Sequence, residues 1–165
     1  AACDEGQRGV KGTGGMPKEE FEALVEEIAA LNPTDGPAVS PLMGGSWELA
    51  WTTEKEVLFL IEKGLFWDQC TKVYQEIDVA APSLSNNVEF ENEGCLKVQS
   101  SFMPGQVDGD TARFDFKFNT LAVKWRDIKL SLPPVGAGWS KQIFLDKTLR
   151  MQRDSRGDLA IYCKR

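Results

Sequence analysis

The side chains of this sequence that could take part in acid–base chemistry are carboxylates in two neighbouring segments, residues 73–79 and 88–93. A pair of carboxylates, one protonated and one ionised, is the arrangement that glycoside hydrolysis needs. Here the acidic residues alternate with apolar ones such as Val73, Ile77 and Val88, which places them on the solvent-facing side of predicted strands. We therefore expect no catalysis from this set, which comprises Glu76, Asp78, Glu89, Glu91 and Glu93.

Other common catalytic and cofactor-binding groups are missing. The chain has no histidine, which removes the usual general base near neutral pH and the Ser-His and Cys-His nucleophile arrangements. The four cysteines form no C-x-x-C pair; one disulfide is compatible with their number, but we favour free thiols. Neither glycine-rich run, 12–15 or 136–138, has the context of a phosphate-binding loop. We expect no metal and no cofactor. The cysteines are Cys3, Cys70, Cys95 and Cys163.

The composition indicates one globular domain. The chain has 165 residues and is 42% apolar, with five tryptophans and nine phenylalanines, enough to build a core without disulfide or metal staples. Nineteen basic against twenty-five acidic residues give a net charge of −6, so nucleic acid is not an expected partner. No apolar run approaches the ~20 residues of a membrane-spanning helix.

The N-terminal quarter divides at Pro17. Residues 1–16 hold five glycines and little to bury, so we expect a mobile tail. In residues 17–32, apolar side chains recur at helical spacing and glutamates take the other face, which predicts an amphipathic helix. Its glutamate-rich polar face argues against a membrane-surface helix, and we expect it to cover an end of the following domain as a lid. Residues 17–165 are expected to form that single domain.

From Trp47 onward the hydrophobic period changes to two, the period of strands. Short alternating segments follow one another almost to the C-terminus, and only residues 53–64 look helical. A parity change near residues 126–127 suggests a bulge or bend, and Ser155-Arg156-Gly157 reads as a hairpin turn. About eight strands joined by short turns predict a mainly β fold, an up-and-down antiparallel barrel whose interior can hold one small ligand. A two-sheet sandwich is the alternative.

The first strand begins in the stretch GGSWELAWTT, residues 44–53. A glycine two residues before a tryptophan at the start of the first strand is how lipocalin-like barrels close their base. The indole of Trp47 then needs a cap, and an arginine from a late strand can lie on its face. Arg150 and Arg153 are the candidates.

Several blocks, in order, resemble the plastid-lipid-associated proteins, also called plastid fibrillins. They are FEALVEEIAALNPT, GGSWELAWTT, VYQEIDV with Asn86-Asn87-Val88, and FLDKTLRMQRDSRGDLAIYCKR, and together they span residues 21–165. The C-terminal block is the most specific of them, whereas residues 96–139 match only in pattern. The sequence departs from the family in having Ala50-Trp51 where a tyrosine is common before the two threonines.

The resemblance implies a lipocalin-like barrel in the plastid (chloroplast), at thylakoids or lipid droplets called plastoglobules, after removal of a transit peptide. It implies a protein that binds or organises a hydrophobic small molecule such as an isoprenoid, quinone, carotenoid or fatty acid, and that is not an enzyme. One branch of the family is an accessory to plastoquinone synthesis. The alternative is therefore a non-catalytic scaffold that binds an enzyme of prenylquinone or lipid synthesis through its outer surface. An enzyme acting on a small isoprenoid is a third, less favoured possibility.

The alternation of large apolar residues supplies candidates for a cavity lining, although the same rings could simply fill the barrel. The interior candidates are Trp47, Leu49, Trp51, Phe90, Val98, Phe102, Phe114, Phe116, Phe118, Trp125, Leu130 and Met151. The residues of the structural motif are Gly45, Trp47, Asp146, Arg150 and Arg153.

The C-terminal quarter is locally basic within an acidic chain. It could attach to anionic headgroups, but a solvated face with one arginine stacked on Trp47 is the favoured interpretation. The basic residues are Lys141, Lys147, Arg150, Arg153, Arg156, Lys164 and Arg165.

Overall fold

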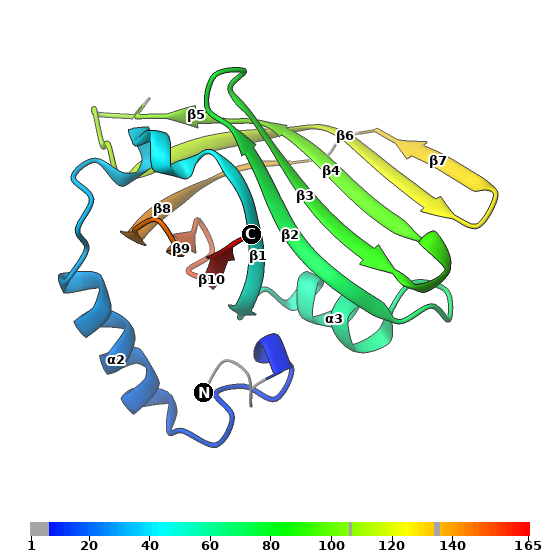
Figure 1. Cartoon of the computed structure of the whole chain (residues 1–165), viewed down its shortest axis with the longest axis horizontal. Helices are drawn as coiled ribbons and strands as arrows, with labels where there is room; N and C mark the ends of the chain where they lie inside the picture. Colours follow the sequence, from blue (N-terminus) through cyan, green and yellow to red (C-terminus); the bar gives the residue numbers. More distant parts are fainter. Residues whose placement is uncertain (1–6, 106, 134–135) are drawn as a thin grey trace.

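A computed structural model describes residues 7–105, 107–133 and 136–165. In this part of the chain, eight antiparallel strands close into a barrel (Figure 1), because β4 pairs with both β3 and β6 and so joins the two ends of the sheet. The predicted lipocalin-like barrel is therefore confirmed, and the sandwich alternative is wrong. Around the barrel the strands are β1 (Gly45–Thr52), β2 (Cys70–Asp78), β3 (Ser83–Phe90), β4 (Cys95–Ser101), β6 (Arg113–Trp125), β8 (Ala137–Leu145), β9 (Leu149–Asp154) and β10 (Leu159–Lys164).

Two short strands lie outside the closed ring. Both β5 (Met103–Pro104) and β7 (Ile128–Leu132) pair with β6. Trp125 pairs with Ile128 across a two-residue turn in which Arg126 has φ 53°, so the parity change predicted as a bulge or bend is the tip of a hairpin. The bulge in β6 lies earlier, at Asn119, which the register between Ser100–Phe118 and Gln99–Thr120 leaves without a partner.

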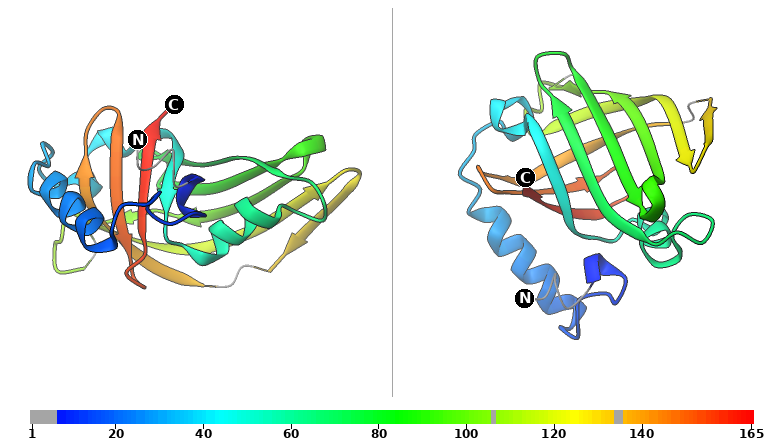
Figure 2. Two further views of the ribbon diagram at one scale, coloured as in Figure 1. Left: turned by 90° about the horizontal axis from the view of Figure 1, so that it is seen from below. Right: turned by 45° about the vertical axis from the view of Figure 1, so that its right-hand side comes forward.

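The helices are α2 (Lys18–Ala30) and α3 (Lys55–Lys63), with 3₁₀ turns η1 (Gln7–Gly9), η2 (Pro37–Val39), η3 (Pro41–Met43) and η4 (Glu91–Glu93). Helix α2 lies against the outside of the barrel, beside β8, β9 and β10 (Figures 1 and 2). Its buried residues Phe21 and Val25 pack with Trp51, Phe144 and other residues of an outer cluster. The helix was expected over an end of the barrel as a lid, whereas it covers the outer face.

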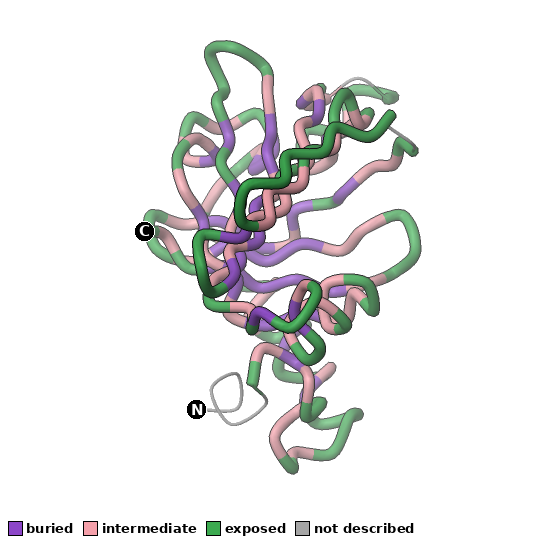
Figure 3. Tube along the Cα trace, turned by 90° about the vertical axis from the view of Figure 1, so that its right-hand side faces the viewer, coloured by how far each residue is buried: buried purple, intermediate pink, exposed green. Residues whose placement is uncertain are grey.

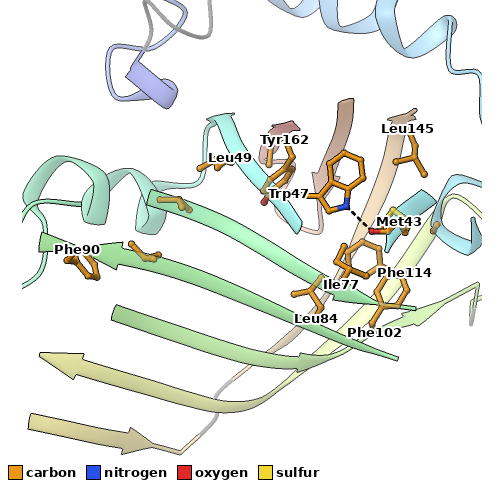
Figure 4. Close-up of a cluster of buried hydrophobic side chains, with 14 residues drawn as sticks. Met43, Trp47, Leu49, Ile77, Leu84, Phe90, Phe102, Phe114, Leu145 and Tyr162 are labelled. Carbon is orange, nitrogen blue, oxygen red and sulfur yellow. Dashed lines mark hydrogen bonds between the residues drawn. The ribbon is translucent and has the colours of Figure 1, made fainter. Parts of the chain in front are cut away.

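One end of the barrel is closed by packed side chains. Trp47 is fully buried and its Nε1 donates a hydrogen bond of 2.8 Å to the carbonyl of Met43, at the end of η3. Figure 4 shows this indole above a group of apolar side chains that includes Ile77, Phe102 and Phe114. Burial is concentrated on the strands of the closed ring, while many turns (Figure 3) and the whole of β7 are exposed.

The N-terminal residues 7–16 differ from the expected mobile tail. Gly9 is buried beside β1, with φ 103°, and a Cβ at this position would lie 2.0 Å from the carbonyl oxygen of Thr52. Trp51 Nε1 donates a 3.0 Å hydrogen bond to the carbonyl of Gly12. Residues 1–6 of the expected tail lie outside the described residues, and the division of the chain at residue 17 stays a prediction.

No helix among the described residues has the length and apolar character needed to cross a bilayer.

Candidate ligand cavity

A cavity of about 530 Å³ lies inside the barrel, within the range of known small-molecule sites. Its wall is mainly apolar and comes from α3 and from strands on several sides of the barrel. Three phenyl rings of β6 run along it, with centroids 6.2 Å apart for Phe114 and Phe116 and 5.5 Å apart for Phe116 and Phe118. The apolar lining is Leu49, Val57, Leu60, Val73, Leu84, Val88, Leu96, Val98, Phe114, Phe116, Phe118 and Ala137.

Five of the twelve predicted interior residues line this cavity: Leu49, Val98, Phe114, Phe116 and Phe118. Another three, Trp47, Phe90 and Phe102, are buried in the inner core cluster, where they fill space. The remaining four lie elsewhere. Which of these residues contact a ligand stays a prediction.

Trp51 and Met151 were predicted inside the barrel but belong to the outer cluster beneath α2. In β1, Leu49 pairs with Tyr162 and Trp51 pairs with Ile161, so Ala50 has no partner. Such a bulge adds one residue and moves the following side chains to the other face. Met151 faces out because strand neighbours alternate and Arg150 faces in.

The other two misplaced candidates lie near the end of the barrel opposite Trp47. Trp125 is half-buried, and its Nε1 donates a 2.8 Å hydrogen bond to the buried carboxylate of Asp68. Leu130 is 51% exposed, on β7. Neither lines the cavity.

The closed end is held by Arg150, which is fully buried. Its guanidinium carbon lies 5.3 Å from the Trp47 ring centroid and 4.3 Å from that of Tyr162, and it donates hydrogen bonds to the side-chain oxygens of Gln75 and, at 3.2 Å, Gln152. Burial lowers the pKa of Arg150 to about 10, so it is charged at neutral pH. The predicted stacking of Arg150 on Trp47 is present.

The other motif residues have separate structural roles. Arg153 pairs with Glu22 of α2 and does not contact Trp47. Gly45 has φ 112° at the start of β1. The Asp146 carboxylate accepts 2.6 Å hydrogen bonds from the backbone N–H groups of Thr148 and Leu149, which lower its pKa and fix the turn between β8 and β9.

One part of the cavity wall is acidic. Arg156 bridges three carboxylates, with N–O distances of 2.7 Å to Glu56, 3.3 Å to Asp154 and 3.5 Å to Asp158. Beside this group, burial raises the pKa of Glu54 to about 7, and the nearby charge of Asp154 acts in the same direction. Glu54, Glu56, Asp154 and Arg156 all line the cavity.

The sequence did not indicate this acidic group. Glu54 and Glu56 stand at the start of α3, where carboxylates are usual and solvent-exposed, while Asp154 and Arg156 belong to a hairpin turn. The carboxylates that the sequence singled out lie elsewhere: Glu76, Asp78, Glu91 and Glu93 are exposed, as expected, and Glu89 is half-buried. None of these five lines the cavity.

No group of three or more residues suited to hold a metal ion occurs among the described residues. Cys70 and Cys95 carry free thiols, and Cys3 lies outside the described residues. In chemical terms the cavity offers an apolar body, one acidic wall, and uncharged polar side chains that include Gln75, Asn86, Asn87, Ser140 and Gln152.

Comparisons with known proteins agree with the resemblance that the sequence blocks indicate. The family model PAP_fibrillin matches residues 1–163. The chain is 39% identical, over 72% of its length, to the probable plastid-lipid-associated protein 11, chloroplastic, of Arabidopsis thaliana, of which it covers 55%. It is 23% identical, over 89% of its length, to the chromoplast-specific carotenoid-associated protein of Cucumis sativus, of which it covers 60%.

A third relative, the probable plastid-lipid-associated protein 12, chloroplastic, of Arabidopsis thaliana, is 28% identical over 90% of this chain, which covers 40% of that protein. The chain thus spans about half the length of the curated relatives that it matches. No solved structure matches it at a significant level.

Proposed function

The chain belongs to the PAP_fibrillin family, and from that premise we propose that it binds an uncharged hydrophobic small molecule, of the isoprenoid, quinone or carotenoid class, inside its barrel. The observation that carries the proposal is the cavity of about 530 Å³ with its row of phenyl rings from β6. The free energy falls when an apolar guest replaces water at apolar surface of this kind.

The relatives support this class of ligand and the plastid as the site of action. Two carry names that describe plastid-lipid-associated proteins of chloroplasts, and the cucumber protein is named for its association with carotenoid in chromoplasts. We propose the same compartment for this chain, with thylakoids or plastoglobules as its place within the plastid.

We propose a binding role without catalysis. The carboxylates that the sequence offered for acid–base chemistry lie away from the cavity. At the cavity wall, Asp154 and Glu56 are paired with Arg156, so we do not expect either to act with Glu54 as the second carboxylate of an acid–base pair.

The test is to extract the protein from its native source and to identify co-purifying molecules by mass spectrometry. A stoichiometric apolar lipid is the expected result. A protein partner held in stoichiometric amounts without any lipid would instead favour the scaffold function, and conversion of an added lipid into a new product would favour an enzyme.

A further inference from the structure

The wall of the barrel is incomplete beside β7. Along one edge of β6, β8 pairs with residues 113–117 and β7 pairs with residues 121–125. Among the described strands β7 pairs with β6 alone, so its other edge has no strand partner there. Figures 1 and 2 show β7 extending from the barrel at the same end as the loop between α3 and β2.

A row of apolar side chains runs from the cavity wall across β6 to β7. Leu130 of β7 pairs with Val123 of β6, and Val123 pairs in turn with Leu96, which lines the cavity. Cross-strand partners point to the same face of a sheet, so the apolar row on β7 lies on the cavity face. Its members Ile128, Leu130 and Leu132 are 58%, 51% and 38% exposed.

The loop between α3 and β2 adds aromatic residues at the same end. Phe66 and Trp67 are 56% and 84% exposed, and their rings lie 4.9 Å and 6.2 Å from that of Trp125. Their φ angles are 52° and 142°, a region that residues with side chains rarely adopt. The loop therefore holds two large apolar side chains outward in a strained backbone conformation. Together with the β7 row they form an apolar rim, which we define as Phe66, Trp67, Trp125, Ile128, Leu130 and Leu132.

We propose that the apolar rim docks on an uncharged lipid surface and that the cavity exchanges its ligand with that surface at the β7 end of the barrel. Only the exchange of ligand rests on the proposed function, because the docking is inferred from the exposed rim residues alone. Exposed apolar surface of this extent marks an interaction site in a soluble domain. Tryptophan is enriched at membrane interfaces, because the indole has an apolar body and one polar N–H.

The local charge is close to neutral and gives the rim little electrostatic attraction to an anionic surface. The segments that carry the rim, residues 62–69 and 124–132, hold four basic and three acidic residues, whereas the whole chain carries −6. Within the basic C-terminal quarter, Arg153 and Arg156 are already paired with carboxylates. Attachment should therefore depend on apolar burial and change little with ionic strength.

Flotation of the full chain with pure phosphatidylcholine vesicles tests the proposal. The variant Trp67→Ser/Leu130→Ser removes two exposed rim side chains. The matched control Leu31→Ser/Val39→Ser removes two side chains that are 76% and 50% exposed and that belong to the end of α2 and to η2, away from β7 (Figure 1). We expect the rim variant to bind vesicles at least tenfold more weakly, because a loss of about 1.4 kcal/mol of apolar burial suffices for that factor, while the control binds as wild type and high salt has little effect.

Other outcomes would overturn the proposal. These are wild type that stays with the soluble fraction, equal losses in the rim and control variants, or a wild-type dimer that the rim variant converts to monomer. Titration of the same proteins with an apolar fluorescent probe, without vesicles, separates docking from ligand binding. The rim variant should bind the probe as wild type does. If wild type docks through the rim but binds no probe, the proposed function is contradicted and the docking proposal is kept.

Discussion

Leu49 and Trp51 are two residues apart in β1 but lie on opposite sides of the barrel wall. Leu49 lines the cavity, whereas the Trp51 ring lies 4.6 Å from that of Phe21 in α2. Ala50, between them, has no partner in β10, and this bulge moves the side chains that follow it to the other face of the strand. Trp51 therefore attaches the helix to the barrel and takes no part in the cavity.

Replacing Trp51 with alanine should lower stability without altering the cavity. Trp51 is 3% exposed, and truncation of a buried tryptophan usually costs about 3–5 kcal/mol. We expect a loss of this size in urea-induced unfolding, with unchanged affinity for an apolar probe in the fraction that stays folded. A clear loss of probe affinity would place Trp51 in the binding site after all.

Arg150 and Arg153 should respond differently to the same substitution by methionine. Arg150→Met removes a fully buried cation from two rings and two glutamine side chains, and we expect a loss of about 2–4 kcal/mol in the free energy of unfolding. Arg153→Met breaks a partly exposed pair with Glu22, for which at most about 1 kcal/mol is expected. Equal losses would contradict the role of Arg150 at the closed end of the barrel.

The ionisation of Glu54 should make the folded state less stable as the pH rises. Its pKa is raised from 4.5 to about 7 in the folded protein, so the folded state holds the proton more tightly than the unfolded chain does. The resulting penalty is absent below about pH 4.5, grows from there, and is complete above about pH 7. The charges around this carboxyl are those of Asp154, Arg156, Asp158 and Glu56.

The variant Glu54→Gln checks this pH dependence, since its side chain keeps the same shape and has no charge. Unfolding free energies of wild type and variant, measured between pH 5 and pH 8, should diverge in favour of the variant as the pH rises. Parallel curves would show that Glu54 ionises normally.

The acidic wall should make the cavity discriminate against carboxylates. The carboxylates of Glu56, Asp154 and Asp158 carry three negative charges around Arg156. Arg156 and the buried Arg150 carry two positive charges, so the net charge of the group is negative. Glu54 makes it more negative when it ionises. In displacement of an apolar probe at pH 8, hexadecanol should compete at least about tenfold better than hexadecanoate, since charge repulsion of about 1.4 kcal/mol suffices for that factor. Glu54→Gln should narrow the ratio, and equal competition by the two ligands would refute the prediction.

Much of the barrel was predictable because its strands alternate cleanly. Phe114, Phe116 and Phe118 share a face as the period of two requires, and the turn after Asp154 reads directly from its sequence. Strand β8 was not predicted. Its Gly138 weakens the strand pattern, yet a Cβ there would lie 2.9 Å from the ring of Phe116, so the packing of the cavity wall requires this glycine.

An apolar cavity inside the barrel was predictable from the sequence, but only some of its lining residues were. The bulge at Ala50 depends on the register with β10, which a single strand does not reveal. Leu130 continues the correct face of the sheet, but β7 leaves the barrel, so Leu130 is exposed. The acidic wall was not predictable, because it brings the start of α3 next to a turn about 100 residues further along, as in the contact of Glu56 with Arg156.

The most direct test of the central claim is to fill the cavity with the protein's own side chain. Val98→Trp places an indole in the cavity wall, and Val79→Trp places the same residue at a position that is 41% exposed. In titrations with an apolar fluorescent probe, wild type and Val79→Trp should bind saturably with one site, while Val98→Trp, shown to be folded by circular dichroism, should bind at least tenfold more weakly. Equal binding by the three proteins, or no saturable binding by wild type, would contradict a ligand inside the barrel.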